Sequence, residues 1–166
     1  MLHDTRHFSA SASFRAALAT HPPGAPSILK RGPDPKYVEE EEIDVTLVPD
    51  AEADIHISDR AAEQLQSVAQ RQNNPYVALR VTVDSGGCHG YQYKVEIAKE
   101  EHLDDYIFEH ATIKPSNLYI DAISLAMING STVDYATELI GSSFKVVDNP
   151  RSKGSGCGCG TSWELK

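Results

Sequence analysis

The sequence predicts a mainly β fold with an N-terminal helix, which makes an α+β arrangement with a single core. Three observations predict it. The chain has 166 residues of which 40% are apolar, one segment has helical hydrophobic periodicity, and several short segments alternate apolar and polar residues. A chain of this length can bury one core of ordinary size, and it offers no case for a second folded domain.

Charge and composition divide the chain into three parts. Residues 1–33 hold four basic residues and one acidic residue, and their basic, serine-rich composition is typical of a mitochondrial transit peptide. A disordered tail without a targeting role is the alternative. Residues 34–54 are strongly acidic, and we interpret them as a solvated linker with a weak strand over 43–48. The folded domain is expected over 55–166, with a fold that does not depend on the residues before 34.

The basic N-terminal part allows two interpretations of its processing. The stretch 6–9, Arg-His-Phe-Ser, resembles a mitochondrial processing site. Only a few residues would precede such a cut, fewer than an import helix of several turns needs. Either an upstream presequence is missing before Met1, or the import signal extends towards Lys30-Arg31 and the cut lies later.

The first element of the folded domain is an amphipathic helix. Ser58 has the side chain of an N-cap, the apolar residues Ala61 and Leu65 recur at i and i+4, and a stop signal follows over 73–75. The pattern predicts a helix over 58–71.

Alternating segments after this helix predict strands, and a second short helix is expected over 122–128, with Asp121 as its cap. The strands are expected over 77–83, 91–97, 106–108, 111–114, 118–120, 131–137 and 143–147.

All three cysteines lie among glycines. Cys88 is in the loop 84–90 between two predicted strands, and Cys157 and Cys159 are in a tail, 151–160, that is expected to be mobile without a ligand. Glycines permit positive φ and a close approach of the backbone to whatever a sulfur binds. A cysteine used only for packing does not need such a loop, so a ligand role is favoured for Cys88.

The spacing Cys157-Gly158-Cys159 favours a metal over a redox disulfide. One intervening residue disfavours an unstrained disulfide, and thiol oxidoreductases normally have two intervening residues. Three thiolates suit Zn²⁺, Cu⁺ or an iron–sulfur cluster. A closed structural zinc site needs four ligands, and His89, the one histidine beside a cysteine, is expected to be solvated. The incomplete site is therefore labile, or another chain or a thiol completes it.

Net charge excludes some classes of partner. Fifteen Lys and Arg against twenty-four Asp and Glu give 15 − 24 = −9, which disfavours binding to nucleic acid or to an anionic membrane surface. No stretch approaches the ~20 apolar residues of a membrane-spanning helix. No arrangement of a nucleophile with a histidine and a carboxylate can be identified, so the chain is not predicted to be an enzyme.

The two cysteine motifs, Ser85-Gly86-Gly87-Cys88-His89-Gly90-Tyr91 and Cys157-Gly158-Cys159-Gly160-Thr161-Ser162-Trp163, resemble those of the A-type iron–sulfur carriers, the IscA-like and HesB-like family. The resemblance extends over 55–166, and is strongest to the second mitochondrial A-type paralogue of eukaryotes. Trp163 stands where the family usually has Phe.

The resemblance implies a fold and a cargo. The expected fold is a compact HesB-like domain of two packed sheets, with the cysteine loop and the cysteine tail at a subunit interface. By similarity, Cys88, Cys157 and Cys159 hold a [2Fe–2S] or [4Fe–4S] cluster that two protomers share. An iron-only donor, a zinc-binding protein and, less favoured, a thiol oxidoreductase remain alternatives.

The resemblance also implies partners and a location. The partners are a second copy or the sister A-type paralogue, an aminomethyltransferase-like folate-binding assembly protein, and a monothiol glutaredoxin as cluster donor. The expected role is a carrier or scaffold that delivers clusters to apo [4Fe–4S] proteins, such as aconitase and lipoyl synthase, in the mitochondrial matrix.

Overall fold

The computed structural model describes residues 25–86, 90–98, 100–139, 141–155 and 161–166. Within these residues, no helix combines the length and the apolar character that crossing a membrane requires. In chain order the elements are β1 (Ala25–Arg31), α1 (Pro35–Glu40), β2 (His56–Ile57), α2 (Asp59–Arg71), β3 (Ala78–Ser85), β4 (Tyr91–Ala98), β5 (Asp105–His110), β6 (Asn117–Asp121), α3 (Ala122–Ile128), β7 (Thr132–Glu138), β8 (Gly141–Val147), β9 (Ser152–Ser155) and β10 (Ser162–Leu165).

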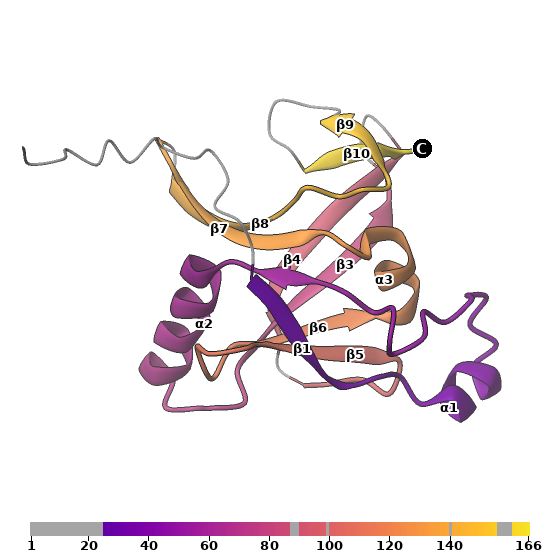
Figure 1. Ribbon diagram of the computed structural model, residues 1–166, viewed down its shortest axis with the longest axis horizontal. Coiled ribbons are helices and arrows are strands. Elements are labelled where there is room, and N and C mark those ends of the chain that lie inside the picture. The colour runs from indigo at the N-terminus through magenta and orange to yellow at the C-terminus, as the bar shows by residue number, and fades with distance from the viewer. Residues whose placement is uncertain (1–24, 87–89, 99, 140, 156–160) are drawn as a thin grey trace, which may run out of the picture.

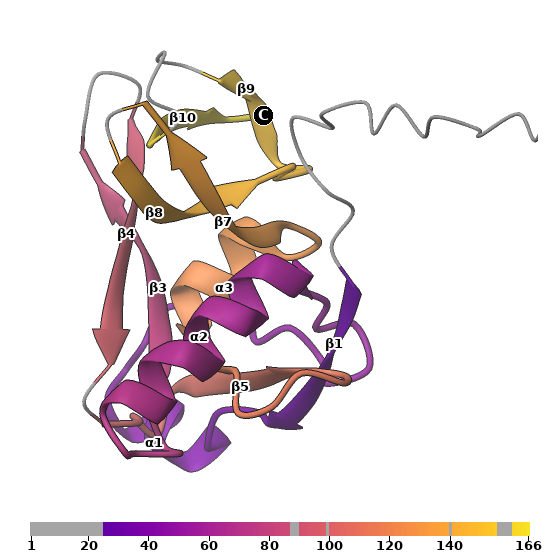
Figure 2. The ribbon, with the colours of Figure 1, turned by 90° about the vertical axis from the view of Figure 1, so that its left-hand side faces the viewer.

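The ten strands form one curled sheet in the order β8-β7-β2-β1-β5-β6-β3-β4-β10-β9 (Figures 1 and 2). β1 joins its two halves, because Ala25 and Pro26 pair with β2 while the residues from Ser27 onward pair with β5. β4 and β8 are far apart in strand order, yet they contact each other across the fold. The mainly β fold is confirmed, and the two packed layers are the halves of one continuous sheet.

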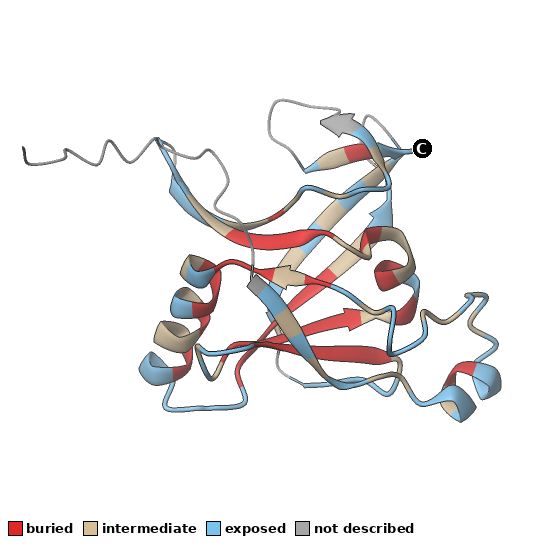
Figure 3. Ribbon diagram, viewed as in Figure 1, coloured by how far each residue is buried: buried red, intermediate tan, exposed pale blue. Residues whose placement is uncertain are grey.

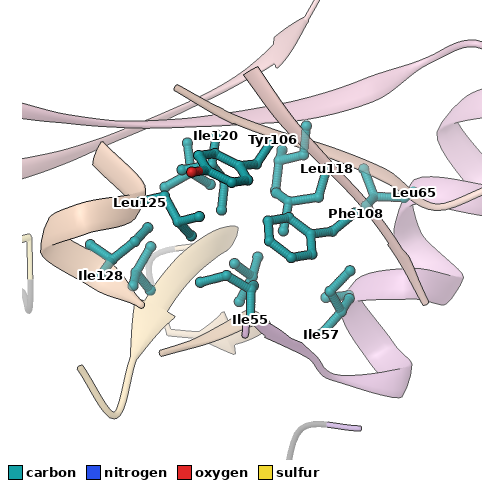
Figure 4. Packing of buried hydrophobic residues seen from close by; sticks show 14 of the residues in the cluster. Ile55, Ile57, Leu65, Tyr106, Phe108, Leu118, Ile120, Leu125 and Ile128 are labelled. Carbon is teal, nitrogen blue, oxygen red and sulfur yellow. The ribbon is translucent and has the colours of Figure 1, made fainter. Parts of the chain in front are cut away.

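The core lies inside the curl, where β2, β5 and β6 face α2 and α3 (Figure 3). Figure 4 shows large aliphatic and aromatic side chains of this core packed together. The labelled members, all fully buried, are Ile55, Ile57, Leu65, Tyr106, Phe108, Leu118, Ile120, Leu125 and Ile128.

Helix α2 forms where the sequence predicts it. The Ser58 side chain accepts a hydrogen bond from the Ala61 amide at 3.2 Å, which satisfies one of the free N–H groups of the first turn. Ala61, Leu65 and Ala69 are buried against the sheet. The predicted second helix is confirmed as well, since Asp121 caps α3 through the Ser124 amide at 2.8 Å.

A buried carboxylate links α2 to β7. Asp134, which is 1% exposed, accepts hydrogen bonds from Ser58 Oγ at 2.6 Å, from Arg60 Nε at 2.6 Å and from the Tyr135 amide at 2.8 Å. Burial by itself raises the pKa of a carboxyl group, but these donors outweigh it and hold the pKa of Asp134 below its ordinary value.

We expect the Asp134 carboxylate to make the free energy of unfolding depend on pH. A group with a depressed folded-state pKa stabilises the fold above its unfolded pKa of about 3.9, and this contribution is lost as the pH falls through the lower folded value. The free energies of unfolding of the wild type and of Asp134→Asn, measured with urea, should therefore differ most at neutral pH. The difference should shrink as the pH falls below about 4. The exposed Asp44 provides the control, Asp44→Asn. A difference that stays constant down to about pH 2 would contradict the interpretation.

Most strand predictions are confirmed, but the strand expected over 111–114 is wrong. Nδ1 of the buried His110 accepts hydrogen bonds from the Thr112 amide at 3.3 Å and the Ile113 amide at 3.0 Å. Ser116 Oγ donates to the Ile113 carbonyl at 2.6 Å. These local bonds turn the chain between β5 and β6 instead of extending it.

The structure argues against the prediction that the fold is independent of the residues before 34. β1 lies within the sheet, although Ala25–Arg31 were assigned to a targeting or disordered segment. Lys30 is ion-paired with Glu109 at 3.9 Å, and Arg31 with Glu101 at 3.1 Å. Three of the seven residues of this strand are polar, so its sequence lacks the apolar periodicity on which the prediction depended.

Residues 34–54 are packed on the fold rather than forming a free linker. They contain α1, whose N-cap Asp34 accepts from the Lys36 amide at 2.9 Å. The weak strand predicted over 43–48 is wrong, since Val45 and Leu47 pack against the core without strand pairing.

The C-terminal tail also contains structure that the sequence did not predict. β9 covers Ser152–Ser155, inside the segment expected to be mobile, and pairs with β10. This short hairpin ends the sheet beside β4.

Candidate metal centre

The three predicted ligands, Cys88, Cys157 and Cys159, lie outside the described residues. His89, which was expected to be solvated, also lies outside them. The structure describes the backbone on both sides of each cysteine segment. Gly86 and Gly90 flank the first segment, and Ser155 and Thr161 flank the second.

The first segment connects β3 to β4 in an antiparallel hairpin, with Ser85 opposite Tyr91. The Gly86 amide donates to the Gly90 carbonyl at 2.8 Å, which closes the base of the hairpin. Gly86 has φ 146° and Gly90 has φ 100°. Residues with a side chain rarely adopt these φ values, whereas an added Cβ would find room at both positions. Gly86 and Gly90 are therefore needed for the path of the backbone rather than for space.

The second segment connects β9 to β10, and β10 pairs with the beginning of β4. Trp163 is opposite Tyr91 on one side and Ser155 on the other. The Tyr93 amide donates to the Thr161 carbonyl at 3.0 Å. Both cysteine segments therefore leave the sheet at the beginning of β4.

An aromatic cluster holds β10 against β4. Trp163, the one tryptophan of the chain, is 2% exposed. Its ring centroid lies 5.3 Å from that of Tyr91 and 5.4 Å from that of Tyr93, the second pair being stacked at 17°. Both tyrosines are partly buried and pack against the core.

Asn149 is a functional candidate that the sequence analysis did not identify. Its Nδ2 donates to Tyr93 Oη at 2.9 Å and to the Met127 carbonyl at 3.4 Å. Its Oδ1 accepts from the Arg151 amide at 2.9 Å. An asparagine before a proline indicates a turn, but the sequence contains no signal for the distant tyrosine.

The described residues contain one other group with metal-ligand chemistry: His102, Asp104 and Asp105. Both carboxylate oxygens of Asp105 accept from Arg80, at 2.6 and 2.7 Å, and one also accepts from the His102 amide at 2.7 Å. Asp105 is thus committed to an ion pair, and we assign this group a structural role.

Comparisons with known proteins agree with the cysteine motifs. A family model described as iron-sulphur cluster biosynthesis matches residues 53–161. Iron-sulfur assembly protein 2 of Schizosaccharomyces pombe is 40% identical over 112 residues, which cover 68% of this chain and 53% of that protein. The chain therefore spans about half of the length of this relative.

A second relative matches over more of its own length. The mitochondrial iron-sulfur cluster assembly 2 homolog of Homo sapiens is 35% identical over 115 residues, which cover 69% of this chain and 70% of that protein. Among solved structures, the crystal structure of IscA with the [2Fe-2S] cluster has a TM-score of 0.56 at 21% identity, covering 68% of this chain and 98% of that one, and it supports the fold. The chain belongs to the iron–sulphur cluster biosynthesis family, whose A-type carriers its cysteine motifs resemble.

Proposed function

We propose that the chain is a carrier, not an enzyme, which holds an iron–sulfur cluster as cargo through Cys88, Cys157 and Cys159 and hands it to apo-proteins. The main support for this proposal is one structural observation. The pairing of β10 with the first residues of β4 fixes the ends of both cysteine segments on neighbouring strands. Membership of a family of cluster biosynthesis supports the same conclusion.

Chain reach is compatible with one shared centre. Thr161 is bonded to Tyr93, which is three residues from Gly90, so the two ends lie about 10 Å apart along β4. Each cysteine segment can extend about 7 Å from its end over two residues. A shared centre requires the second segment to bend back over the beginning of β4, and its alternating glycines permit such a bend.

Three thiolates on two segments suit a cargo that has to leave again. A four-iron cluster bound by one copy lacks one ligand, and two copies together offer six cysteines. We therefore propose that the loaded form is a homodimer or a heterodimer with the sister A-type paralogue.

The finer assignments have partial support from the relatives. A relative named as mitochondrial, together with the composition of residues 1–24, which contain one acidic residue, supports a mitochondrial role in the maturation of [4Fe–4S] proteins. A monothiol glutaredoxin as donor and a folate-binding assembly protein as partner remain part of the proposal.

Anaerobic reconstitution tests the carrier function. The wild-type chain should bind iron and acid-labile sulfide in equal amounts and show visible charge-transfer absorption. The Cys88→Ser, Cys157→Ser, Cys159→Ser triple variant should lose all of these signals, because no cysteine remains. His89→Ala, which alters the same segment without removing a proposed ligand, should retain them.

The other outcomes separate the alternatives. A full cluster in the triple variant would contradict the proposed ligands. Metal without sulfide in the wild type would favour an iron-only or zinc protein, and catalytic disulfide reduction by the apo-protein would favour an oxidoreductase. Native mass measurement of the loaded protein should give a dimer, and a monomer with one complete cluster and no small thiol would contradict the shared site.

A further inference from the structure

The hairpin of β7 and β8 projects from the rest of the sheet (Figure 1). Its base is fixed, because the buried Asp134 accepts hydrogen bonds from the start of α2 and the ring centroids of Tyr135 and Phe144 lie 4.9 Å apart. In the part of the chain that the structure describes, β2 pairs with β7 only at Thr132 and Val133. Beyond the two rings, β7 therefore pairs with β8 alone, and an isolated two-stranded ribbon is only marginally stable in water.

β8 is also an edge of the sheet, because it stands at one end of the strand order. Natural proteins usually protect such an edge with a proline, with charged side chains or with a covering segment. β8 contains no proline, and its one charged residue, Lys145, is ion-paired with Glu138 of the same hairpin. Among the described residues, no backbone group outside β7 bonds to β8. The edge is therefore open to another strand.

The pairing of β7 decides which backbone groups of β8 point outward. The Val133 carbonyl accepts from the cap residue of α2, so every second residue of β7, counted from Val133, points toward β2. The residues between them bond with β8, and opposite residues either exchange hydrogen bonds or make none. Thr137 is opposite Ser142, and Tyr135 is opposite Phe144. Neither pair exchanges bonds, so the N–H and C=O groups of Ser142 and Phe144 point away from β7, at the free edge.

A second copy of the chain has the same edge and can pair with it antiparallel about a two-fold axis. Burial and charge select the register. An axis at Phe144 would require the outward groups of Val146, which is 5% exposed and belongs to the core. An axis at Lys145 would place two lysines opposite each other. An axis at Ser143 avoids both problems, because Ser142 then exchanges hydrogen bonds with Phe144 of the second copy, and the reverse.

The charge of the whole chain also favours this edge as the contact between copies. The net charge is −9, so two copies repel each other over most of their surface. Residues Gly141–Phe144 of β8 are uncharged, and the neighbouring Lys145 is balanced by Glu138. Two copies that meet along this stretch therefore join uncharged strands.

We propose that two copies of the metal-free chain pair through β8, with Ser143 on the two-fold axis, so that their hairpins form one sheet in the order β7-β8-β8-β7. A sheet of more than two strands has the mutual support that a two-stranded ribbon lacks. This inference goes beyond the proposed function, because it concerns the chain without its cargo. It also brings together the two copies that a shared cluster requires.

Ser142→Pro tests the edge, because proline removes the outward N–H of this residue. Thr137→Pro is a matched control. Thr137 is directly opposite Ser142, but its amide points to the other edge of the hairpin. Thr137 Oγ1 accepts a hydrogen bond from Ser142 Oγ at 3.0 Å. Both variants therefore lose the same side-chain bond and keep the backbone bonds between β7 and β8.

Sedimentation equilibrium of the full chain, reduced and in the presence of a chelator, measures the dissociation constant of the dimer. We expect the wild type and Thr137→Pro to have the same constant. Ser142→Pro should raise it about tenfold or more, because each dimer loses a backbone hydrogen bond at both copies of this residue. A monomeric wild type, equal constants in all three chains, or equal weakening in both variants would overturn the proposal.

Hydrogen exchange of the wild type is a second measurement that needs no variant. Over the range of protein concentration in which the dimer forms, the amides of Ser142 and Phe144 should exchange more slowly as the concentration rises, whereas the Thr137 amide should not change. Exchange at Ser142 and Phe144 that does not depend on concentration would overturn pairing through β8. Both measurements use metal-free protein, so a chain that binds no cluster would contradict the proposed function alone.

Discussion

A chain that lacks residues 1–33 will be unfolded, or far less stable than a chain that lacks only residues 1–24. The nine residues by which the two truncations differ contain β1, which pairs with β2 and β5 and joins the halves of the sheet. Without β1, the backbone groups of β5 that pair with it lose their partners beside buried side chains such as Phe108.

Thermal unfolding of both truncated chains, followed by circular dichroism, tests this expectation. The chain without residues 1–24 is the reference, so any contribution of those residues cancels in the comparison. Equal melting temperatures would show that the fold does not need β1, as the sequence alone predicts.

Two neighbouring residues of β1 separate packing from strand pairing. Leu29 packs against the core, whereas Ile28 is 47% exposed. Leu29→Ala should lower the free energy of unfolding by about 1–3 kcal/mol, below the range for fully buried leucines, and Ile28→Ala should change it by less than about 0.5 kcal/mol.

The same strand bears on the processing of the N-terminus. A cut after Lys30-Arg31, one of the two alternatives from the sequence, would remove β1. We therefore expect the mature protein to begin at or before Ala25, which N-terminal sequencing of protein isolated from mitochondria can establish.

The sequence predicted α2 and the β3–β4 hairpin well because their signals are local. Ser58 and the spacing of Ala61 and Leu65 lie within two helical turns, and β4 alternates partly buried and exposed residues as expected. β1 could not be predicted in the same way, because its place depends on β5, about eighty residues further along the chain.

The candidate site likewise has some features with a local sequence signal and others without one. The cysteine spacing and the flanking glycines are sequence features, and they predicted metal chemistry and the family. The hydrogen bond between Asn149 and Tyr93 joins residues 56 positions apart. No local pattern in a single sequence predicts such a pair. Arg80 did carry a local signal, since it is a charged residue inside an apolar strand segment.

Arg80 provides the second large prediction. Its guanidinium forms a two-point ion pair with Asp105, which is fully buried, and also donates to the Glu100 carbonyl at 3.1 Å. Its Cζ lies 5.7 Å from the centroid of the Tyr119 ring. The pair thus fixes the loop after β4 to β5.

Arg80→Ala should lower the free energy of unfolding by about 3–5 kcal/mol, because it leaves the Asp105 carboxylate buried without its partner. Chemical denaturation at neutral pH measures this loss. The double variant Arg80→Met, Asp105→Leu removes both charges at similar volume, and it should recover much of the stability, since buried ion pairs offer little over well-packed apolar residues. If the double variant is no more stable than Arg80→Ala, then the unpaired charge is not the cause of the loss. The hydrogen bonds that Asp105 accepts would then account for the lost stability. The double variant removes all of them, including the bond from the His102 amide.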